Sequence, residues 1–241
     1  MMSESSFPID EKIGILYIAT GSKYIKAAIH SAQSARKFCP GLPIHLYANY
    51  RDYDFQFDQS PHPFTSVGEV KNPHRRSKVD YIAQTPFERT LYLDTDTELN
   101  ADISQVFKIL DRFDLAACHT PHRNSSKGKQ IWHFEIPDAF PEFNSGVFLY
   151  KKSPAVLKFL EDWKTGFHDA GFMKDQVTLR ELLWASDLRI ATLPPEYNIR
   201  YMKYHYIWEK KEATSKIFHL RRFHHGRFSK ITRLLKKMFF F

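Results

Sequence analysis

The chain has 241 residues, of which 43% are hydrophobic and 26% are charged. These values are ordinary for a folded globular protein, and they exclude collagen-like, coiled-coil and wholly disordered classes. Two cysteines are too few for a disulfide scaffold or a zinc cluster, and apolar runs such as residues 15–19 are far shorter than the roughly 20 residues that cross a bilayer. We therefore expect one folded domain in a reducing, cytoplasmic setting.

The formal net charge of +8 is concentrated near the C-terminal end of the sequence. Residues 216–241 hold eight Lys or Arg and no Asp or Glu, so basic and acidic residues balance in the rest of the chain. A nucleic-acid groove across the whole domain needs Lys and Arg distributed along it. The pattern therefore predicts no nucleic-acid partner, and it favours a local anionic partner for the basic end.

The first part of the chain alternates between strand and helix patterns. Residues 13–19 form a continuous apolar run that suits a strand buried on both faces, and Thr20-Gly21-Ser22 supplies a turn. Apolar residues at helical spacing over residues 25–38 predict a helix that stops at Pro40-Gly41. Residues 44–47 then resume extended structure.

The same alternation continues to residue 193. Further strands are predicted over residues 90–93, 115–118, 146–150 and 189–193. Further helices are predicted over residues 77–83, 103–110 and 173–186, and one more begins with Ser153 as N-cap and Pro154 at its first position. Repeated β-α units of this kind predict an α/β fold with a mainly parallel central sheet and helices on both faces.

Two stretches do not follow the alternation. Residues 119–143 are rich in His, Lys, Pro and aromatics, and they are longer than a connection without a function usually is, so we predict a loop that covers the substrate. Residues 197–211 hold several aromatics and scattered Lys, which fits either packing or an acceptor surface. Trp132, His133 and Tyr201 are candidates for stacking on an acceptor sugar, with ordinary packing as the alternative for each.

The sharpest chemical signal is Asp94-Thr95-Asp96 at the end of a predicted strand. In extended backbone the two carboxylates lie on the same side, and the carboxyl end of a parallel strand is where ligands bind in open α/β sheets. Paired hard oxygen ligands suit Mg²⁺ or Mn²⁺ bound to a substrate diphosphate. The bare tripeptide also fits a solvated turn at a strand end.

Further motifs accompany this pair in a fixed order along the chain. They are Ala19-Thr20-Gly21-Ser22, Lys78 in a predicted helix, the segment from Glu88 to Asp96, Asn144-Ser145-Gly146 with its flanking apolar residues, Lys174-Asp175-Gln176, and Ile217-Phe218-His219. Over residues 13–226 this arrangement resembles glycosyltransferases of the GT-A fold, in particular family-8-like nucleotide-diphospho-sugar transferases. The resemblance implies a Rossmann-like nucleotide-sugar-binding domain over residues 13–226. Residues 227–241, which follow it, are a separate basic tail by their charge pattern.

The resemblance also implies roles for individual residues. Asp94, Asp96 and His219 would bind Mn²⁺ or Mg²⁺ on the nucleotide diphosphate, and Asn144, Asp175 and Gln176 would be the catalytic residues beside the donor sugar. The other implied donor-binding residues are Ala19, Thr20, Tyr24, Lys78, Thr95, Ser145 and Gly146. The implied reaction moves a sugar from a nucleotide-diphosphate donor, with a UDP-sugar favoured, to a hydroxyl of a glycan or glycolipid, with retention of anomeric configuration.

Elementary chemistry agrees with some of these roles and offers alternatives for others. A leaving diphosphate gains negative charge, which a metal and a cation such as Lys78 would stabilise. The alternative for Lys78 is a solvated helix residue, that for Gly146 is a kink at the entry of a strand, and that for Asp175 is capping of a helix N-terminus.

The chain departs from the family pattern at two places. The segment after His219 lacks the usual Gly-x-x-Lys-Pro-Trp-like sequence, which leaves His219, His224 and His225 as candidate metal ligands, with His219 preferred because an apolar strand-like pair precedes it. The Asp that usually reads the base in the first loop is also missing, since residues 20–24 read Thr-Gly-Ser-Lys-Tyr. The choice of UDP therefore rests on the resemblance alone.

Two other classes of function remain open. Asp94-Thr95-Asp96 also resembles the nucleophile motif of haloacid-dehalogenase-like phosphatases, although Glu98 stands where those enzymes place Thr or Val. The second alternative is a non-catalytic lipid- or nucleic-acid-binding adaptor with a transferase-like core. The balanced charge of residues 1–215 counts against the nucleic-acid version.

Residues 227–241 predict a basic amphipathic helix. Five apolar side chains share one face of a helical projection and basic side chains occupy the rest, the apolar ones being Phe228, Ile231, Leu235, Met238 and Phe239. This is the pattern of an interfacial helix on an anionic membrane, with packing against the domain as the alternative. We therefore expect a cytoplasmic enzyme, peripheral on the inner face of a membrane, with a lipid-linked glycan as a fitting acceptor.

Overall fold

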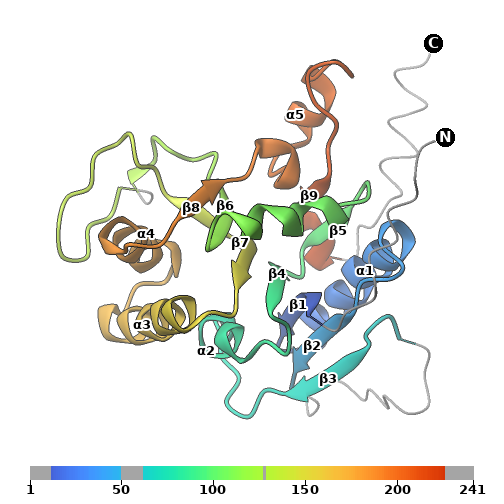
Figure 1. The fold of residues 1–241 in the computed structure, drawn as a ribbon, viewed down its shortest axis with the longest axis horizontal. Coiled ribbons are helices and arrows are strands. Elements are labelled where there is room, and N and C mark those ends of the chain that lie inside the picture. The colour runs from blue at the N-terminus through green and yellow to red at the C-terminus, as the bar shows by residue number, and fades with distance from the viewer. Residues whose placement is uncertain (1–11, 50–61, 127–128, 226–241) are drawn as a thin grey trace.

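The computed structural model of the protein describes residues 12–49, 62–126 and 129–225. A seven-stranded sheet forms its centre, in the order β3-β2-β1-β4-β7-β6-β8 (Figure 1). Its strands are β1 (Ile13–Ala19), β2 (Ile44–Ala48), β3 (Ser66–Glu69), β4 (Arg89–Leu93), β6 (Leu115–His119), β7 (Phe143–Lys151) and β8 (Ile190–Thr192). The chain thus has the α/β architecture that its sequence pattern predicts.

Most neighbouring strands are parallel, and β7 is the exception. The pairs β1/β2, β1/β4, β2/β3 and β6/β8 are parallel, whereas β7 runs antiparallel to both β4 and β6. The chain between β6 and β7 returns through residues 120–142, and the described residues of this range contain no α-helix. Without a crossover helix, the next strand can lie antiparallel beside the one before it. The mainly parallel sheet is therefore confirmed, and the antiparallel strand was not predicted.

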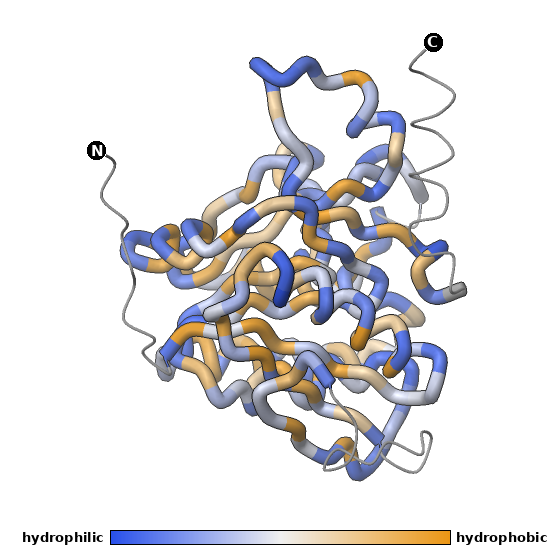
Figure 2. Tube along the Cα trace, turned by 90° about the vertical axis from the view of Figure 1, so that its right-hand side faces the viewer, coloured by the Kyte–Doolittle hydropathy of each residue, from blue (hydrophilic) through white to orange (hydrophobic). Residues whose placement is uncertain are grey.

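Helices cover both faces of the sheet, as predicted (Figure 1). In β1, Ile15 and Tyr17 pack into the core beside α1 (Ser22–Phe38), while Leu16 packs into the core on the opposite face. The opposite core contains residues of α3 (Pro154–Ala170), α4 (Gln176–Ala185) and the short α2 (Lys78–Tyr81) with the 3₁₀ turn η2 (Ile82–Gln84). Figure 2 shows hydrophobic stretches of the chain gathered toward the middle of the trace and hydrophilic stretches mostly toward its periphery.

Local signals account for both ends of α3, of which the sequence predicted the first. The Ser153 side chain accepts a hydrogen bond from the Val156 N–H at the start of α3, with Pro154 at the first helical position. Gly171 ends α3 with a φ of 65°, a left-handed conformation that glycine adopts at little cost. The helix predicted over residues 103–110 is instead the 3₁₀ helix η3 (Ser104–Asp111).

The remaining elements are a small second sheet and the segments around residues 195–225. Two three-residue strands, β5 (Thr97–Leu99) and β9 (Ile217–His219), pair antiparallel in a small second sheet. Residues 197–211, for which the sequence allowed either packing or an acceptor surface, contain α5 (Met202–Ile207). The 3₁₀ turn η5 (Pro195–Tyr197) precedes it. A last 3₁₀ turn, η6 (Arg221–His225), ends the described chain.

The sequence led to two expectations about membranes, and the described residues bear on only one of them. No helix in the described residues is long and apolar enough to cross a membrane. The basic tail over residues 227–241 lies outside the described residues, so its docking on an anionic membrane stays a prediction.

Candidate active site and metal centre

The Asp94-Thr95-Asp96 turn lies between β4 and β5, at the carboxyl end of β4. The pairing of β5 with β9 then brings a distant part of the chain to this turn, because Thr97 lies opposite His219 in the register. The Leu220 N–H also donates to the Asp96 carbonyl over 2.8 Å. A sheet of only two short strands therefore places His219 beside the two carboxylates.

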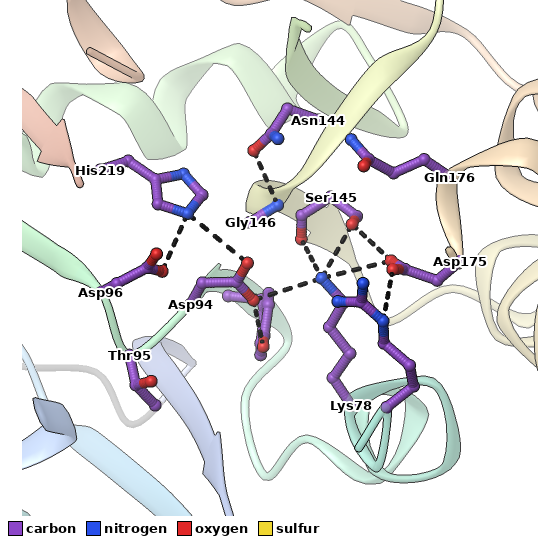
Figure 3. A network of polar contacts seen from close by, with 12 residues as sticks. Lys78, Asp94, Thr95, Asp96, Asn144, Ser145, Gly146, Asp175, Gln176 and His219 are labelled. Carbon is purple, nitrogen blue, oxygen red and sulfur yellow. Dashed lines mark hydrogen bonds and ion pairs between the residues drawn. The ribbon is translucent and has the colours of Figure 1, made fainter. Parts of the chain in front are cut away.

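Three potential metal ligands converge here (Figure 3). His219 Nε2 lies 3.0 Å from Asp96 Oδ1 and 3.6 Å from Asp94 Oδ2. One ligand atom of each residue lies within 4.8 Å of the other two. His219 and Asp96 are buried, and the Asp94 side chain is 26% exposed, so the group opens to solvent on the side of Asp94.

Gly146 on β7 leaves room for this arrangement. A Cβ atom at this position would lie 2.2 Å from His219 Cε1 and 2.5 Å from Asp94 Oδ2. The Gly146 carbonyl accepts the Asp94 N–H over 2.8 Å, which holds the strand against the turn. Close approach, rather than a kink at the strand entry, therefore accounts for glycine here.

The other two histidine candidates are placed differently from His219. His224 Nε2 lies 2.9 Å from Thr95 Oγ1 and 3.9 Å from Asp96 Oδ1, and its ring packs edge-on against the half-exposed Tyr24. Burial lowers the pKa of His224, and the nearby Asp96 only partly opposes this effect. The side chain of His225 lies outside the described part of the structure.

Lys78 is buried between two carboxylates and is not a solvated helix residue. Its Nζ lies 2.8 Å from Ser145 Oγ, 3.2 Å from Asp94 Oδ1 and 3.2 Å from Asp175 Oδ2 (Figure 3). An ammonium group has three hydrogens, and these three oxygens use them. Lys78 therefore joins the metal-ligand side of the site to the Asp175 side.

Asp175 is 1% exposed and precedes the first residue of α4, but its side chain makes no capping hydrogen bond. Its carboxylate instead accepts a hydrogen bond from Ser145 Oγ over 2.5 Å and lies 3.4 Å from Arg76 Nε. Burial would raise the pKa of Asp175, but the charges of Lys78 and Arg76 outweigh it and hold the pKa below its usual range. The helix predicted over residues 173–186 begins at Gln176, directly after Asp175.

Asp96 shows the same balance of effects. Burial would raise its pKa, and the adjacent His219 outweighs burial, so the pKa of Asp96 lies well below its usual range. Asp96 and Asp175 are therefore both ionised near neutral pH. Negative charge at the end of β4 suits a divalent cation.

Asn144 and Gln176 lie near the same group, and Asn144 is buried (Figure 3). Asn144 Oδ1 accepts the Gly146 N–H and an Asn198 Nδ2–H, each over 3.1 Å. Gln176 Nε2 donates to the Phe143 carbonyl over 3.0 Å. Asn198 and Arg76 were not predicted as site residues, because a lone Asn or Arg outside a motif carries no signal in one sequence.

The remaining predicted residues are two donor-binding candidates at the end of β1 and the acceptor candidates. Ala19 is buried at the carboxyl end of β1, and Thr20 Oγ1 lies 3.5 Å from the His74 carbonyl. The acceptor candidates are tied to other partners: Trp132 packs on Gly166 of α3, where a Cβ atom would lie 2.5 Å from its Cη2, and the backbone N–H groups of Trp132 and His133 donate to the Glu181 carboxylate.

Tyr201 forms a hydrogen bond with the His122 ring through its hydroxyl. None of these described contacts joins Trp132, His133 or Tyr201 to the three metal-ligand candidates. Their contact with an acceptor therefore stays a prediction.

Comparison with known proteins gives one kind of match. No family model and no curated protein sequence matches the chain. A structure of LgtC with an active-site mutation matches with a TM-score of 0.62 at 13% identity, covering 86% of this chain and 87% of that chain. A structure of the galactosyltransferase LgtC with donor and acceptor sugar analogues matches with a TM-score of 0.60, also at 13% identity and with the same coverage of the two chains.

Two other solved structures also match. Mouse xyloside xylosyltransferase 1 in its apo form has a TM-score of 0.57 at 13% identity, covering 86% of this chain and 97% of that chain. The glycosyltransferase GlyE of Streptococcus pneumoniae TIGR4 has a TM-score of 0.56 at 17% identity, covering 87% of this chain and 54% of that chain. Identities this low establish the fold alone, and by that measure the chain has the GT-A fold of nucleotide-diphospho-sugar glycosyltransferases.

Proposed function

We propose that this chain is a metal-dependent glycosyltransferase that moves a sugar from a nucleotide-diphosphate donor, UDP-sugar favoured, to a hydroxyl of a glycan or glycolipid. The observation that carries the proposal is the convergence of Asp94, Asp96 and His219 at the end of β4 within a GT-A fold. The carboxyl ends of strands are where α/β folds bind their ligands. The donor sugar would lie next to Asn144 and Gln176.

The donor set fits a divalent cation. Asp94, Asp96 and His219 would hold it with two carboxylate oxygens and one imidazole nitrogen, and the imidazole favours Mn²⁺ over Mg²⁺. When bound, the cation supplies positive charge that stabilises the diphosphate as it leaves. Gly146 keeps the space between the ligands clear of side-chain atoms.

The protein's own side chains offer complementary groups to the sugar. Asn144 Oδ1 is occupied by Gly146 and Asn198, so its Nδ2 is the atom that can donate to a sugar hydroxyl. Gln176 donates through Nε2 to the Phe143 carbonyl, which leaves its Oε1 to face the donor. Both carboxylate oxygens of Asp175 are paired and buried, so its role would be to position Lys78 and Arg76.

A retaining course belongs to this proposal. Gln176 would lie near the sugar face opposite the leaving group, and the departing phosphate would accept the proton of the acceptor hydroxyl. The hydrogens of the Lys78 ammonium group bond protein oxygens, among them Asp94 Oδ1. Lys78 would therefore stabilise the negative charge that develops on the diphosphate by acting through Asp94. The anomer of the product, determined by NMR, tests the stereochemical part.

The experiment is a screen of nucleotide sugars for release of the nucleoside diphosphate, with Mn²⁺, with Mg²⁺ and with EDTA, followed by acceptor trials. We expect turnover with at least one donor, dependent on the cation and lost in Asp94→Ala and Asp96→Ala. Asp111→Ala is the matched control, because Asp111 is an exposed aspartate paired with Arg89 away from the site.

Other outcomes would contradict the proposal. Equal turnover by Asp94→Ala, Asp96→Ala and the unmodified protein would rule out the metal assignment. Hydrolysis of an aryl phosphate that disappears in Asp94→Asn would favour the phosphatase alternative instead.

A further inference from the structure

The orientation of Asn144 is set by a backbone group. The Gly146 N–H, which can only donate, points at Asn144 Oδ1 over 3.1 Å. This contact makes the atom facing Gly146 the carboxamide oxygen. Asn198 lies 3.1 Å from the same oxygen, so it must present its NH₂ group there.

The orientation of Asn198 in turn sets that of His219. With its NH₂ group facing Asn144, Asn198 turns Oδ1 toward His219 Nδ1, 2.8 Å away. A carboxamide oxygen only accepts, so Nδ1 of His219 carries a hydrogen. Nε2, the atom that faces Asp94 and Asp96, is then the nitrogen left to bind a cation.

This chain of hydrogen bonds is buried and held by backbone contacts. Asn144, Asn198 and His219 are 9%, 6% and 2% exposed, so water competes little for their polar groups. The Ile199 N–H donates to the Ile217 carbonyl, and the His219 N–H donates to the Ile199 carbonyl, each over 2.9 Å. The segment that carries Asn198 is therefore fixed alongside β9.

We infer that Asn198 is a positioning residue that holds His219 Nε2 toward the cation and couples the cation site to Asn144 beside the donor sugar. The inference rests on the proposed function, because it assumes that His219 is a metal ligand. Outer partners of metal-bound histidines fix the orientation of the ring, and their removal typically costs about 10- to 100-fold in metal affinity. Asn198 differs from a simple outer partner in that its two ends serve two different halves of the site.

The test compares two substitutions that separate these ends. Asn198→Leu removes both bonds, and we expect Mn²⁺ affinity to fall by about 10- to 100-fold. Asn198→Asp keeps an acceptor for His219 but removes the donor to Asn144, so we expect Mn²⁺ affinity within about threefold of the unmodified value or tighter, together with a lower turnover of nucleotide sugar. Free Mn²⁺ is measured by EPR titration of the full chain, without and with UDP.

A matched control and a folding check accompany these variants. Asn100 donates to the Ser215 carbonyl outside the site, so Asn100→Leu should leave Mn²⁺ affinity unchanged. Thermal unfolding shows whether Asn198→Leu still folds. If it does not, Asn198→Asp alone decides, because the inference requires it to retain Mn²⁺ binding.

The outcomes separate the two proposals. If the unmodified protein binds no Mn²⁺, the metal-dependent function fails and this inference fails with it. If the unmodified protein binds Mn²⁺ and Asn198→Leu binds it equally well, or Asn198→Asp binds it more than tenfold more weakly, only the inference is overturned.

Discussion

Two clusters in the described part of the molecule each bring three potential metal ligands within 4.8 Å of one another. One consists of Asp94, Asp96 and His219, and the other of His74, Asp80 and His168. The first is mostly buried, at the end of β4. The second is at the surface between α2 and α3, where the His168 side chain is 48% exposed.

The two clusters differ in the hydrogen-bond partner of the histidine Nδ1 atom. His219 Nδ1 faces an acceptor, Asn198 Oδ1, which leaves Nε2 for a cation. His74 Nδ1 instead accepts the Arg76 N–H over 3.2 Å, so its Nε2 carries the hydrogen and donates to Asp80. His168 bonds the other oxygen of Asp80 over 2.7 Å. Proximity of ligand types is thus not enough, and we interpret the second cluster as a hydrogen-bonded clamp between α2 and α3.

The largest expected difference between the clusters is in cation binding. His219→Ala removes the only nitrogen of the first cluster, and we expect Mn²⁺ affinity to fall at least about 100-fold, the upper end of the loss that follows removal of an outer partner. His168→Ala removes a histidine from the second cluster and should leave Mn²⁺ affinity unchanged. EPR titration of free Mn²⁺ measures both.

Equal losses in the two histidine variants would contradict the comparison. A loss confined to His168→Ala would reverse it and assign the cation to the surface cluster.

The space between the ligands gives the next largest effect. Gly146→Ala places a Cβ atom against both His219 and Asp94, so one of them must move. We expect Mn²⁺ affinity to fall by about tenfold or more, since two of the three ligands are displaced. Gly41→Ala is the control, because a Cβ atom there meets nothing within 4 Å. Unchanged binding by Gly146→Ala would show that the cation does not use this space.

Features that depend on local sequence could be predicted, whereas features that depend on tertiary contacts could not. The strand over residues 13–19 and the helix stop at residue 38 follow from a continuous apolar run and from Pro40-Gly41, and the structure places both there. These signals are local, so one sequence contains them. The short strand β5 was not predicted, because its three residues show no alternation, and β9 was indicated only by the apolar pair before His219.

The site divides in the same way. Asp94 and Asp96 lie two residues apart after a strand, so their shared side follows from backbone geometry. The partners of Lys78 and the bond from Asn198 to His219 depend on segments far apart in sequence, which only the fold brings together. The local sequence favours His219 only through the apolar pair before it, and the partner of Nδ1 that separates His219 from His74 is a property of the tertiary structure.

Glu142 provides a contrast to the carboxylates of both clusters, and its effect is on the stability of the fold rather than on cation binding. Glu142 is 4% exposed, and no described hydrogen bond or ion pair reaches its carboxyl group. Burial raises the pKa of Glu142 to about 7, with Lys174 opposing and Asp175 adding to the shift. Between its unfolded pKa and pH 7 the folded protein holds a proton that the unfolded chain has lost, so the free energy of unfolding falls as pH rises through this window.

Glu142→Gln should remove that pH dependence. At pH 8 we expect it to be more stable than the unmodified protein by about 1–3 kcal/mol, at about 1.4 kcal/mol per unit of pKa shift, and at pH 5 the difference should be small. Thermal unfolding at the two pH values measures this, with Glu135→Gln, an exposed glutamate of the same loop, as control. A difference that is the same at both pH values would mean that Glu142 is not protonated in the folded state near neutral pH.

The smallest expected effect concerns Asp80, the residue that both histidines of the surface cluster contact. Asp80→Asn keeps the shape of the side chain but removes the charge that His74 and His168 share, and we expect the free energy of unfolding to fall by about 1 kcal/mol or less, because the cluster is partly exposed. For a chain of this size that is a fall of about 2–4 °C in Tm. Mn²⁺ affinity should not change, because the clamp holds α2 to α3 without binding the cation. A large loss of Mn²⁺ binding in Asp80→Asn, with Tm unchanged, would show that Asp80 is a ligand and that hydrogen-bond partners of the imidazoles do not separate a metal site from a clamp.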